Sequence, residues 1–113
     1  MTRQTLPNRR RGIARDLFWT DGASELHFTA NLGFYDDGRI GEVFADTGKT
    51  TAMQSLLDDA CVLISIALQH GLTQEQLSHS LGTVPVYVLG KLTEAPASPI
   101  GTILQAIMEA GNV

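Results

Sequence analysis

The chain has 113 residues, of which 43% are hydrophobic and 18% charged, and its formal net charge is -4. This length fits one domain, and the apolar content is sufficient for one core, which excludes a disordered chain. The acidic balance argues against a general nucleic-acid binder, because such proteins carry an excess of Lys and Arg.

Residues 1–15 are interpreted as a basic N-terminal arm, and residues 16–113 as a single domain. Four of the eight Lys and Arg residues lie between positions 9 and 15, so the arm is cationic while the remainder is acidic. The arginines Arg9, Arg10 and Arg11 could bind a ligand or partner, either an acidic protein face or a phosphate group. The simpler interpretation, which we favour for the arm as a whole, is a solvated chain end.

Three strands are expected after the arm. A short aromatic segment at residues 16–20 ends at Asp21-Gly22, a dipeptide typical of hairpin turns. Residues 26–34 then alternate between apolar and polar side chains, as in a half-buried strand. A second tight turn at residues 36–39 leads to a third strand over residues 40–45. The pattern predicts a three-stranded antiparallel meander with one apolar face.

A helix is expected to cover that face, with Thr50 or Thr51 as its N-cap. Apolar residues between positions 53 and 68 repeat at helical spacing, and residues 60–68 are apolar on almost every side. A helix of that kind is buried on more than one side, either in a core or at a dimer interface. We therefore assign Val62, Leu63 and Ile66 to the interface of a homodimer.

Two further helices are expected, over residues 74–81 and from Ser98-Pro99 onward. The segment between them, residues 83–96, could be an extra strand or an ordered loop, and Pro85 argues against a central strand. Strands first and helices afterwards indicate an α+β fold. We expect a three-stranded antiparallel β-meander followed by two to three helices packed on one face.

The location of the protein is predicted from what the sequence lacks. The longest apolar run, residues 60–68, is far shorter than the ~20 residues that cross a bilayer. No long apolar run follows the basic arm, as it would in a signal peptide. A cytoplasmic protein without membrane contact is expected.

The segment Gly48-Lys49-Thr50-Thr51 invites comparison with a phosphate-binding loop. The first glycine of that motif would fall at position 43, which is Val43, so a plain strand-to-helix turn is favoured. Lys49 and Thr50 could still contact an anion, since free N–H groups at a helix N-terminus attract negative charge.

Other reactive side chains fall into no recognisable catalytic pattern. The histidines His27, His70 and His79 lack the spacing of a metal site, so no metal or cofactor is expected. Cys61 is the only cysteine and lies within the apolar helix, where a thiol is buried and inert. No nucleophile with a partnering base can be named, and an enzyme is therefore not expected.

Several segments resemble one known family. These are Leu6-Pro7 followed by arginines, the GxYxDGxxGEVF element within residues 28–44, residues 56–59, and the ISxALQxG element at residues 64–71. In combination they resemble the TSCPD domain, a C-terminal accessory region of adenosylcobalamin-dependent ribonucleotide reductases that also occurs as small free-standing proteins. The resemblance covers residues 5–81, with a weaker similarity at the last helix.

The family's namesake Thr-Ser-Cys-Pro-Asp aligns with residues 96–100, where Ser98 replaces the cysteine and Ile100 the aspartate. Any thiol function at that point is therefore absent here. The reductase's catalytic barrel, its radical-forming cysteine and its cobalamin site lie outside this region, so the resemblance implies kinship with a reductase module and not reductase activity.

Three functions are compatible with these observations. The first is a non-catalytic accessory or regulatory module that forms a homodimer and contacts a protein such as a ribonucleotide reductase. The second is a phage or mobile-element protein that binds and inhibits a host protein. The third is a small nucleotide-binding sensor that holds phosphates through the basic arm or Lys49.

Overall fold

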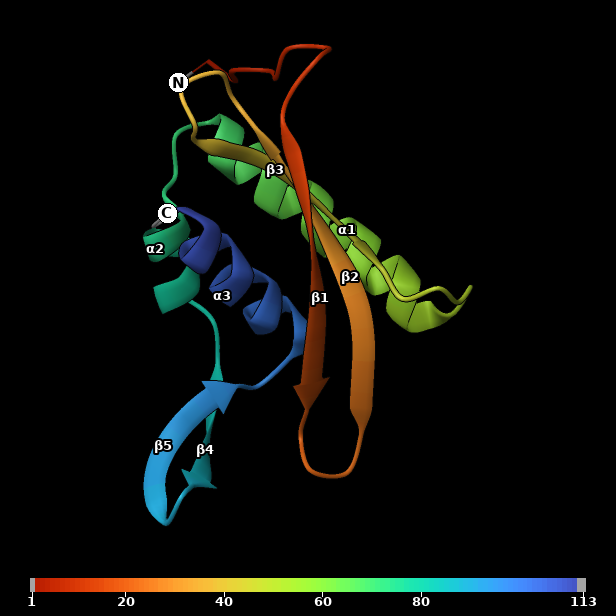
Figure 1. Ribbon diagram of the computed structural model, residues 1–113, viewed down its shortest axis with the longest axis vertical. Coiled ribbons are helices and arrows are strands. Elements are labelled where there is room, and N and C mark those ends of the chain that lie inside the picture. The colour runs from red at the N-terminus through yellow and green to blue at the C-terminus, as the bar shows by residue number, and fades with distance from the viewer. Residues whose placement is uncertain (1, 112–113) are drawn as a thin grey trace.

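The computed structural model describes residues 2–111, which form a three-stranded sheet, three helices and a separate two-stranded hairpin (Figure 1). In chain order the elements are β1 (Gly12–Thr20), β2 (Glu25–Phe34), β3 (Ile40–Asp46), α1 (Ala52–Gln69), α2 (Gln74–His79), β4 (Thr83–Val88), β5 (Lys91–Pro96) and α3 (Pro99–Gly111). The predicted α+β fold is confirmed, with the meander first and the helices after it.

The sheet has the order β1-β2-β3, and both pairs are antiparallel. Leu17 lies opposite Phe28, and Leu32 lies opposite Val43. The alternation in β2 places its apolar residues on the buried face, as predicted. β1 begins at Gly12, so four residues that the sequence analysis assigned to the arm form the first half of this strand.

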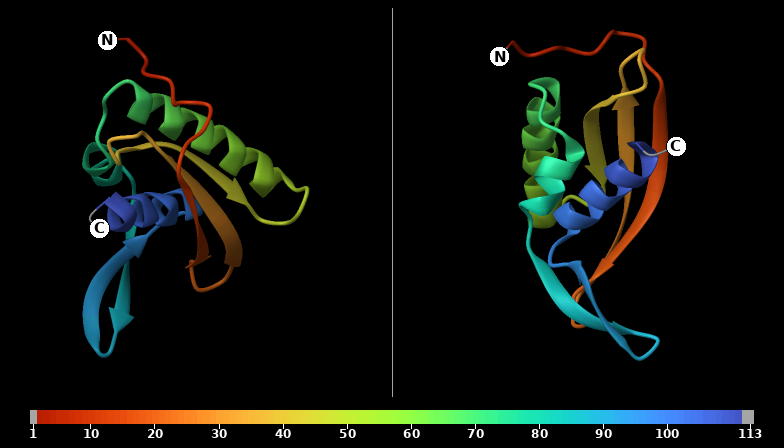
Figure 2. Two further views of the ribbon diagram at one scale, coloured as in Figure 1. Left: turned by 45° about the horizontal axis from the view of Figure 1, so that its top comes forward. Right: turned by 90° about the vertical axis from the view of Figure 1, so that its left-hand side faces the viewer.

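The helices cover one face of the sheet. α1 packs along β3, and α3 packs against β1 and β2, so both lie on the same side (Figure 2). Between the sheet and these helices lies one core. Its buried members are Phe28, Ala30, Leu32, Phe34, Ile40, Val43, Ala45, Leu57, Cys61, Ile64, Leu68, Ile103, Leu104 and Ile107.

α1 begins after Thr51, whose hydroxyl accepts a hydrogen bond from the backbone N–H of Gln54. Within the described chain only one side of the helix is buried, so the expectation of burial on several sides is not met by a single copy. By length and apolar composition alone α1 could also cross a membrane, but its Leu57 and Ile64 belong to the core of the domain.

The ambiguous segment between α2 and α3 is a β-hairpin. β4 and β5 pair with each other and with no strand of the main sheet in the described chain. Pro85 is tolerated because both strands of a two-stranded hairpin are edges. The hairpin projects from the body, and its base is held by a hydrogen bond from Trp19 Nε1 to the carbonyl of Pro96, 3.1 Å (Figure 1).

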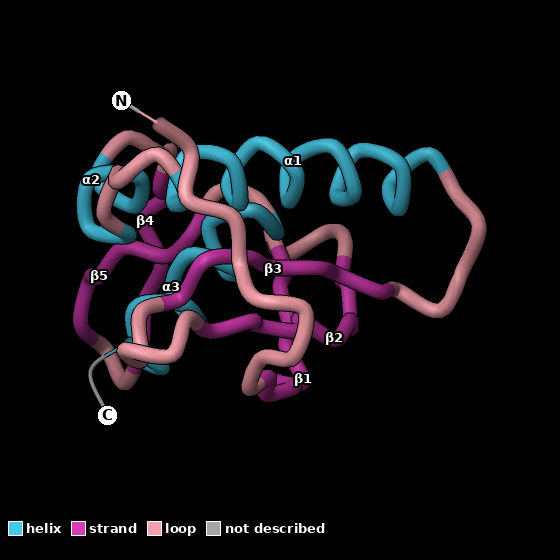
Figure 3. Tube along the Cα trace, turned by 90° about the horizontal axis from the view of Figure 1, so that it is seen from above, coloured by secondary structure: helices cyan, strands magenta, loops and turns pink. Residues whose placement is uncertain are grey.

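The N-terminal arm crosses the C-terminal end of α1 before it enters β1 (Figure 3). The backbone N–H of Gln4 donates to the carbonyl of Gln69 at 2.8 Å, and the guanidinium of Arg11 lies 4.5 Å from the ring centre of Phe34. Gln4 and Arg11 are exposed to solvent, as expected of a chain end, and the folded domain also supplies them with specific partners.

Candidate functional site

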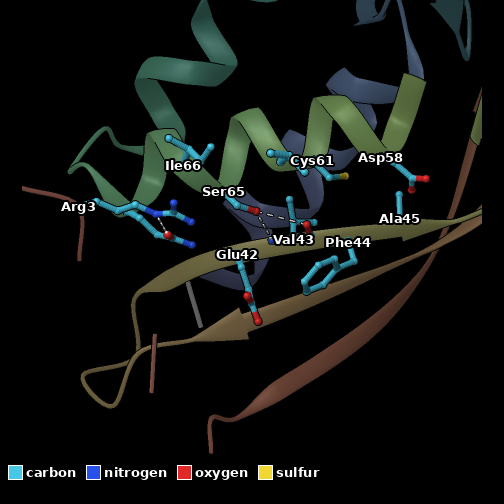
Figure 4. A pocket seen from close by; sticks show the side chains of 11 residues that line it. Arg3, Glu42, Val43, Phe44, Ala45, Asp58, Cys61, Ser65 and Ile66 are labelled. Atoms are coloured by element: carbon cyan, nitrogen blue, oxygen red, sulfur yellow. Dashed lines mark hydrogen bonds between the residues drawn. The ribbon is translucent and has the colours of Figure 1, made fainter. Parts of the chain in front are cut away.

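An apolar hollow with polar groups on its rim lies between α1 and β3. It has a volume of about 300 Å³ and is open to solvent (Figure 4). We call it the α1–β3 groove. Its lining consists of Arg3, Glu42, Val43, Phe44, Ala45, Asp58, Cys61, Val62, Ser65, Ile66 and Gln69.

The bottom of the groove is closed by hydrogen bonds from α1 to the outer edge of β3. Gln69 Nε2 donates to the carbonyl of Gly41 at 2.9 Å. Ser65 Oγ accepts from the N–H of Val43 at 3.0 Å, and Gln54 Nε2 donates to the carbonyl of Ala45 at 2.8 Å. A free strand edge usually invites pairing with another chain. Here the helix occupies that edge, so β3 is closed to strand addition.

Cys61 lies on the same side of α1 as Ser65 and is buried. Burial, and to a lesser extent the nearby carboxylate of Asp58, raises the pKa of the Cys61 thiol to about 11. The thiol is therefore protonated at neutral pH. This agrees with the prediction of a buried, inert cysteine, since the thiolate is the reactive form.

One end of the groove is bordered by charged side chains that the arm brings together. Arg10 Nε forms an ion pair with Glu42 Oε1, and Arg3 Nε donates to Gln69 Oε1 at 2.6 Å. Glu42 also lies over Gly33: a Cβ added there would be 2.6 Å from Glu42 Cγ. Arg10 and Gly33 are distant from Glu42 in the sequence, so local sequence patterns do not identify these contacts.

Of the three residues predicted for a dimer interface, Val62 and Leu63 are exposed and Ile66 is half-buried, and they divide into two groups. Val62 and Ile66 line the groove, whereas Leu63 does not. Adjacent helical residues point about 100° apart, which turns Leu63 away from β3. Leu63 is 69% exposed and Leu56, on the same side of the helix, is 63% exposed. We call Leu56, Val62, Leu63 and Ile66 the α1 outer stripe.

The residues predicted to bind a ligand do not form one site. Arg10 meets Glu42 near the start of β3, while Lys49 and Thr50 lie beyond its end, in the loop that leads to α1 (Figure 3). Arg9 is exposed and Arg11 lies on the ring of Phe34. An anion held at Lys49 could therefore not be shared with the arm.

The loop before α1 is a turn held by its own side chains. Asp46 Oδ1 accepts from the N–H of Gly48 at 2.8 Å, and Gly48 has a φ of 75°. Thr47 Oγ1 accepts from the N–H of Lys49 at 3.3 Å. Two of the N–H groups that a phosphate would need are thus already bonded, as the favoured interpretation of a strand-to-helix turn requires.

Among residues 2–111, no group of three or more His, Cys, Asp or Glu side chains is placed to hold a metal ion. The ring of His27 lies against that of Phe18, with ring centres 4.6 Å apart and the planes tilted by 49°, and His79 lies 3.6 Å from Glu75 on the exposed side of α2. Both histidines therefore have local structural partners.

Comparison with known protein families identifies the family of this chain. The family model for the TSCPD domain matches residues 2–110. The chain belongs to the TSCPD domain family. The match includes the docked arm at one end and α3 at the other, so the arm, the hairpin and the last helix all lie within the family's domain.

Two vitamin B12-dependent ribonucleotide reductases are similar to part of this TSCPD domain. The enzyme of Agrobacterium fabrum is 35% identical over 75 residues, and that of Bradyrhizobium diazoefficiens is 31% identical over 75 residues. Each alignment covers 66% of this chain but 6% of the reductase. The domain is therefore related to a small region of those enzymes. No solved structure matches it significantly.

Proposed function

We propose that this TSCPD protein is a non-catalytic accessory module that acts through protein–protein contacts and self-associates through the solvent-facing side of α1. The observation that carries this proposal is the α1 outer stripe. Large apolar side chains gathered on one exposed helix face are uncommon in monomers and mark interaction surfaces. Covering them stabilises an assembly by about 25 cal/mol for each Å² of apolar surface removed from water.

The size of the domain supports the same conclusion. A chain of 113 residues buries a smaller fraction of its surface than a larger domain does, so association is a common way to gain stability. The closed edge of β3 leaves side-chain packing, and not strand pairing, as the means of contact on this side of the molecule.

Self-association is tested by sedimentation equilibrium of the purified protein over a range of concentrations. We expect a dimer at micromolar concentration, and a monomer for Leu63→Asp, which places a charge in the middle of the stripe. The control is Gln105→Asp, an exposed position on α3. A wild-type protein that stays monomeric at ~0.5 mM, where even a weak interface of millimolar Kd would begin to show, refutes the proposal.

The similar proteins suggest a partner besides a second copy of the chain. We propose a vitamin B12-dependent ribonucleotide reductase as the protein that the module serves, on the grounds that a homologous region forms part of such enzymes. Affinity purification of the tagged chain from its native cell should recover a reductase subunit. Recovery of a single unrelated protein instead would favour the alternative of an inhibitor encoded by a phage or mobile element.

A further inference from the structure

The tip of the β4–β5 hairpin exposes four large apolar side chains. Tyr87 is 77% exposed and Leu89 is 99% exposed, and Val88 and Leu92 are exposed beside them. An isolated two-stranded hairpin is only marginally stable in water. Polar residues would suit such a tip far better, so its composition indicates that the tip is covered by another surface.

The backbone at the tip adds a second, independent observation. Leu89 has a φ of 52° and the following Gly90 has a φ of 77°. Positive φ at both central residues is the geometry of a type I′ turn, for which Asn-Gly is the preferred sequence. A leucine in this conformation is strained, and strain of this kind concentrates at binding sites. The turn thus holds one apolar side chain, Leu89, at the outermost point of the hairpin.

The same chain offers a hollow that matches this side chain. The α1–β3 groove has a volume of about 300 Å³, equal to about ten water molecules, and is lined by Phe44, Val62 and Ile66. That volume admits a leucine side chain. The hairpin projects away from α1 and β3 of its own chain (Figures 1 and 2), so a tip that fills the groove between them belongs to another copy.

Charge complements the apolar fit. Lys91 is exposed two residues after Leu89, and Asp58 lies on the groove lining without a basic partner among the described residues. A lysine that enters beside Asp58 forms a new ion pair at the rim. This complementarity favours a second copy of the chain over an unrelated partner.

We propose that the hairpin tip of one copy inserts Leu89 into the α1–β3 groove of a second copy, with Lys91 next to Asp58, and that the exchange is reciprocal. The inference rests on the self-association proposed above and adds to it a contact at the groove beside the α1 outer stripe. Two equivalent contacts related by a two-fold axis close the assembly as a dimer, whereas a single head-to-tail contact would propagate into a filament.

The test uses one variant on each side of the contact. Leu89→Asn removes the inserted side chain but keeps the fold, because asparagine tolerates positive φ. Val62→Asp places a charge in the groove at an exposed helical position. Each variant alone should weaken dimerisation at least about tenfold, as expected for a central interface residue. Thr93→Asn, on the same hairpin, is the control and should dimerise like the wild type.

Mixing the two variants distinguishes this geometry from a face-to-face contact of two α1 helices. A Val62→Asp chain keeps its tip and a Leu89→Asn chain keeps its groove, so the mixture retains one intact contact and should form heterodimers more tightly than either variant forms homodimers. Sedimentation with one variant carrying a fluorescent label measures this.

The possible results separate the two proposals. If Leu89→Asn dimerises like the wild type, the insertion is refuted while self-association through α1 stands. If neither variant is rescued by the other, the reciprocal exchange is likewise refuted. If the wild type itself is monomeric, self-association fails and the insertion fails with it.

Discussion

The hydroxyl of Ser65 bridges both backbone groups of Val43, since it accepts from the N–H at 3.0 Å and donates to the carbonyl at 3.4 Å. Four residues along a helix rise about 6 Å, and two residues along a strand rise about 6.6 Å. Because the two spacings nearly agree, successive turns of α1 meet alternate residues of β3: Gln69 reaches Gly41, and Ser65 reaches Val43.

Removing the Ser65 hydroxyl should therefore lower the free energy of unfolding by more than the small size of the group suggests. Ser65→Ala leaves the buried N–H of Val43 without a partner, and we expect the free energy of unfolding to fall by about 1–3 kcal/mol. Ser55→Ala is the matched control, because Ser55 is exposed on the same helix and its replacement by alanine raises the helix propensity by the same amount. Urea unfolding followed by circular dichroism compares the two. Equal effects would show that the bridge contributes nothing.

The contact between Glu42 and Gly33 yields a second prediction. Gly33→Ala adds a Cβ that would sit 2.6 Å from Glu42 Cγ, so the carboxylate must leave Arg10 or the strand must shift. We expect a loss of about 1–3 kcal/mol, typical of overpacking. The double variant Gly33→Ala/Glu42→Ala should be more stable than Gly33→Ala alone, because the clash is removed. Additive losses in this cycle would contradict the contact.

The sequence was sufficient to predict the elements whose residues follow a clear period. The alternation over residues 26–34 identified β2 and its buried face, and the helical spacing after Thr51 identified α1. Thr73 was correctly predicted to cap α2, although that helix ends at His79 and not at residue 81. These features depend on neighbouring residues, so local patterns are enough to find them.

Contacts between residues distant in the sequence could not be predicted in the same way. The arm was expected to be solvated, and its exposed residues Arg10 and Gln4 also bond to Glu42 and Gln69. For residues 83–96 the sequence does not decide between a strand and a loop, because Pro85 interrupts the β pattern. The structure places Pro85 on an edge strand, where a proline is tolerated. The groove depends on which side of α1 faces β3, which periodicity cannot specify.

Cys61 makes stability depend on pH in the alkaline range. The unfolded thiol ionises near its ordinary pKa of 9.0, while the folded thiol stays protonated up to about pH 11. The unfolded state therefore releases a proton first, and stability is lost as the pH rises from about 9 to about 11. We expect a loss of about 1–2 kcal/mol, reduced from the full two-unit value by solvent near Asp58.

A comparison with Cys61→Ala isolates this contribution, because burial also raises the pKa of Tyr35. The difference in unfolding free energy between the variant and the wild type should change across pH 9–11 in favour of the variant. A pH-independent difference would mean that the thiol is not protected by burial. Slow reaction of Cys61 with iodoacetamide in the folded protein provides an independent check.

The strained turn at the hairpin tip makes a prediction about the single copy that is separate from association. Leu89 adopts a φ of 52°, which costs most residues about 1 kcal/mol and costs asparagine less. Leu89→Asn should thus raise the free energy of unfolding by about 0.5–1 kcal/mol, measured at concentrations low enough to keep both proteins monomeric. Leu89→Ala lacks the tolerance of asparagine for this conformation and should give a smaller gain. If asparagine destabilised the monomer, Leu89 would be making a stabilising contact within its own chain, contrary to its 99% exposure.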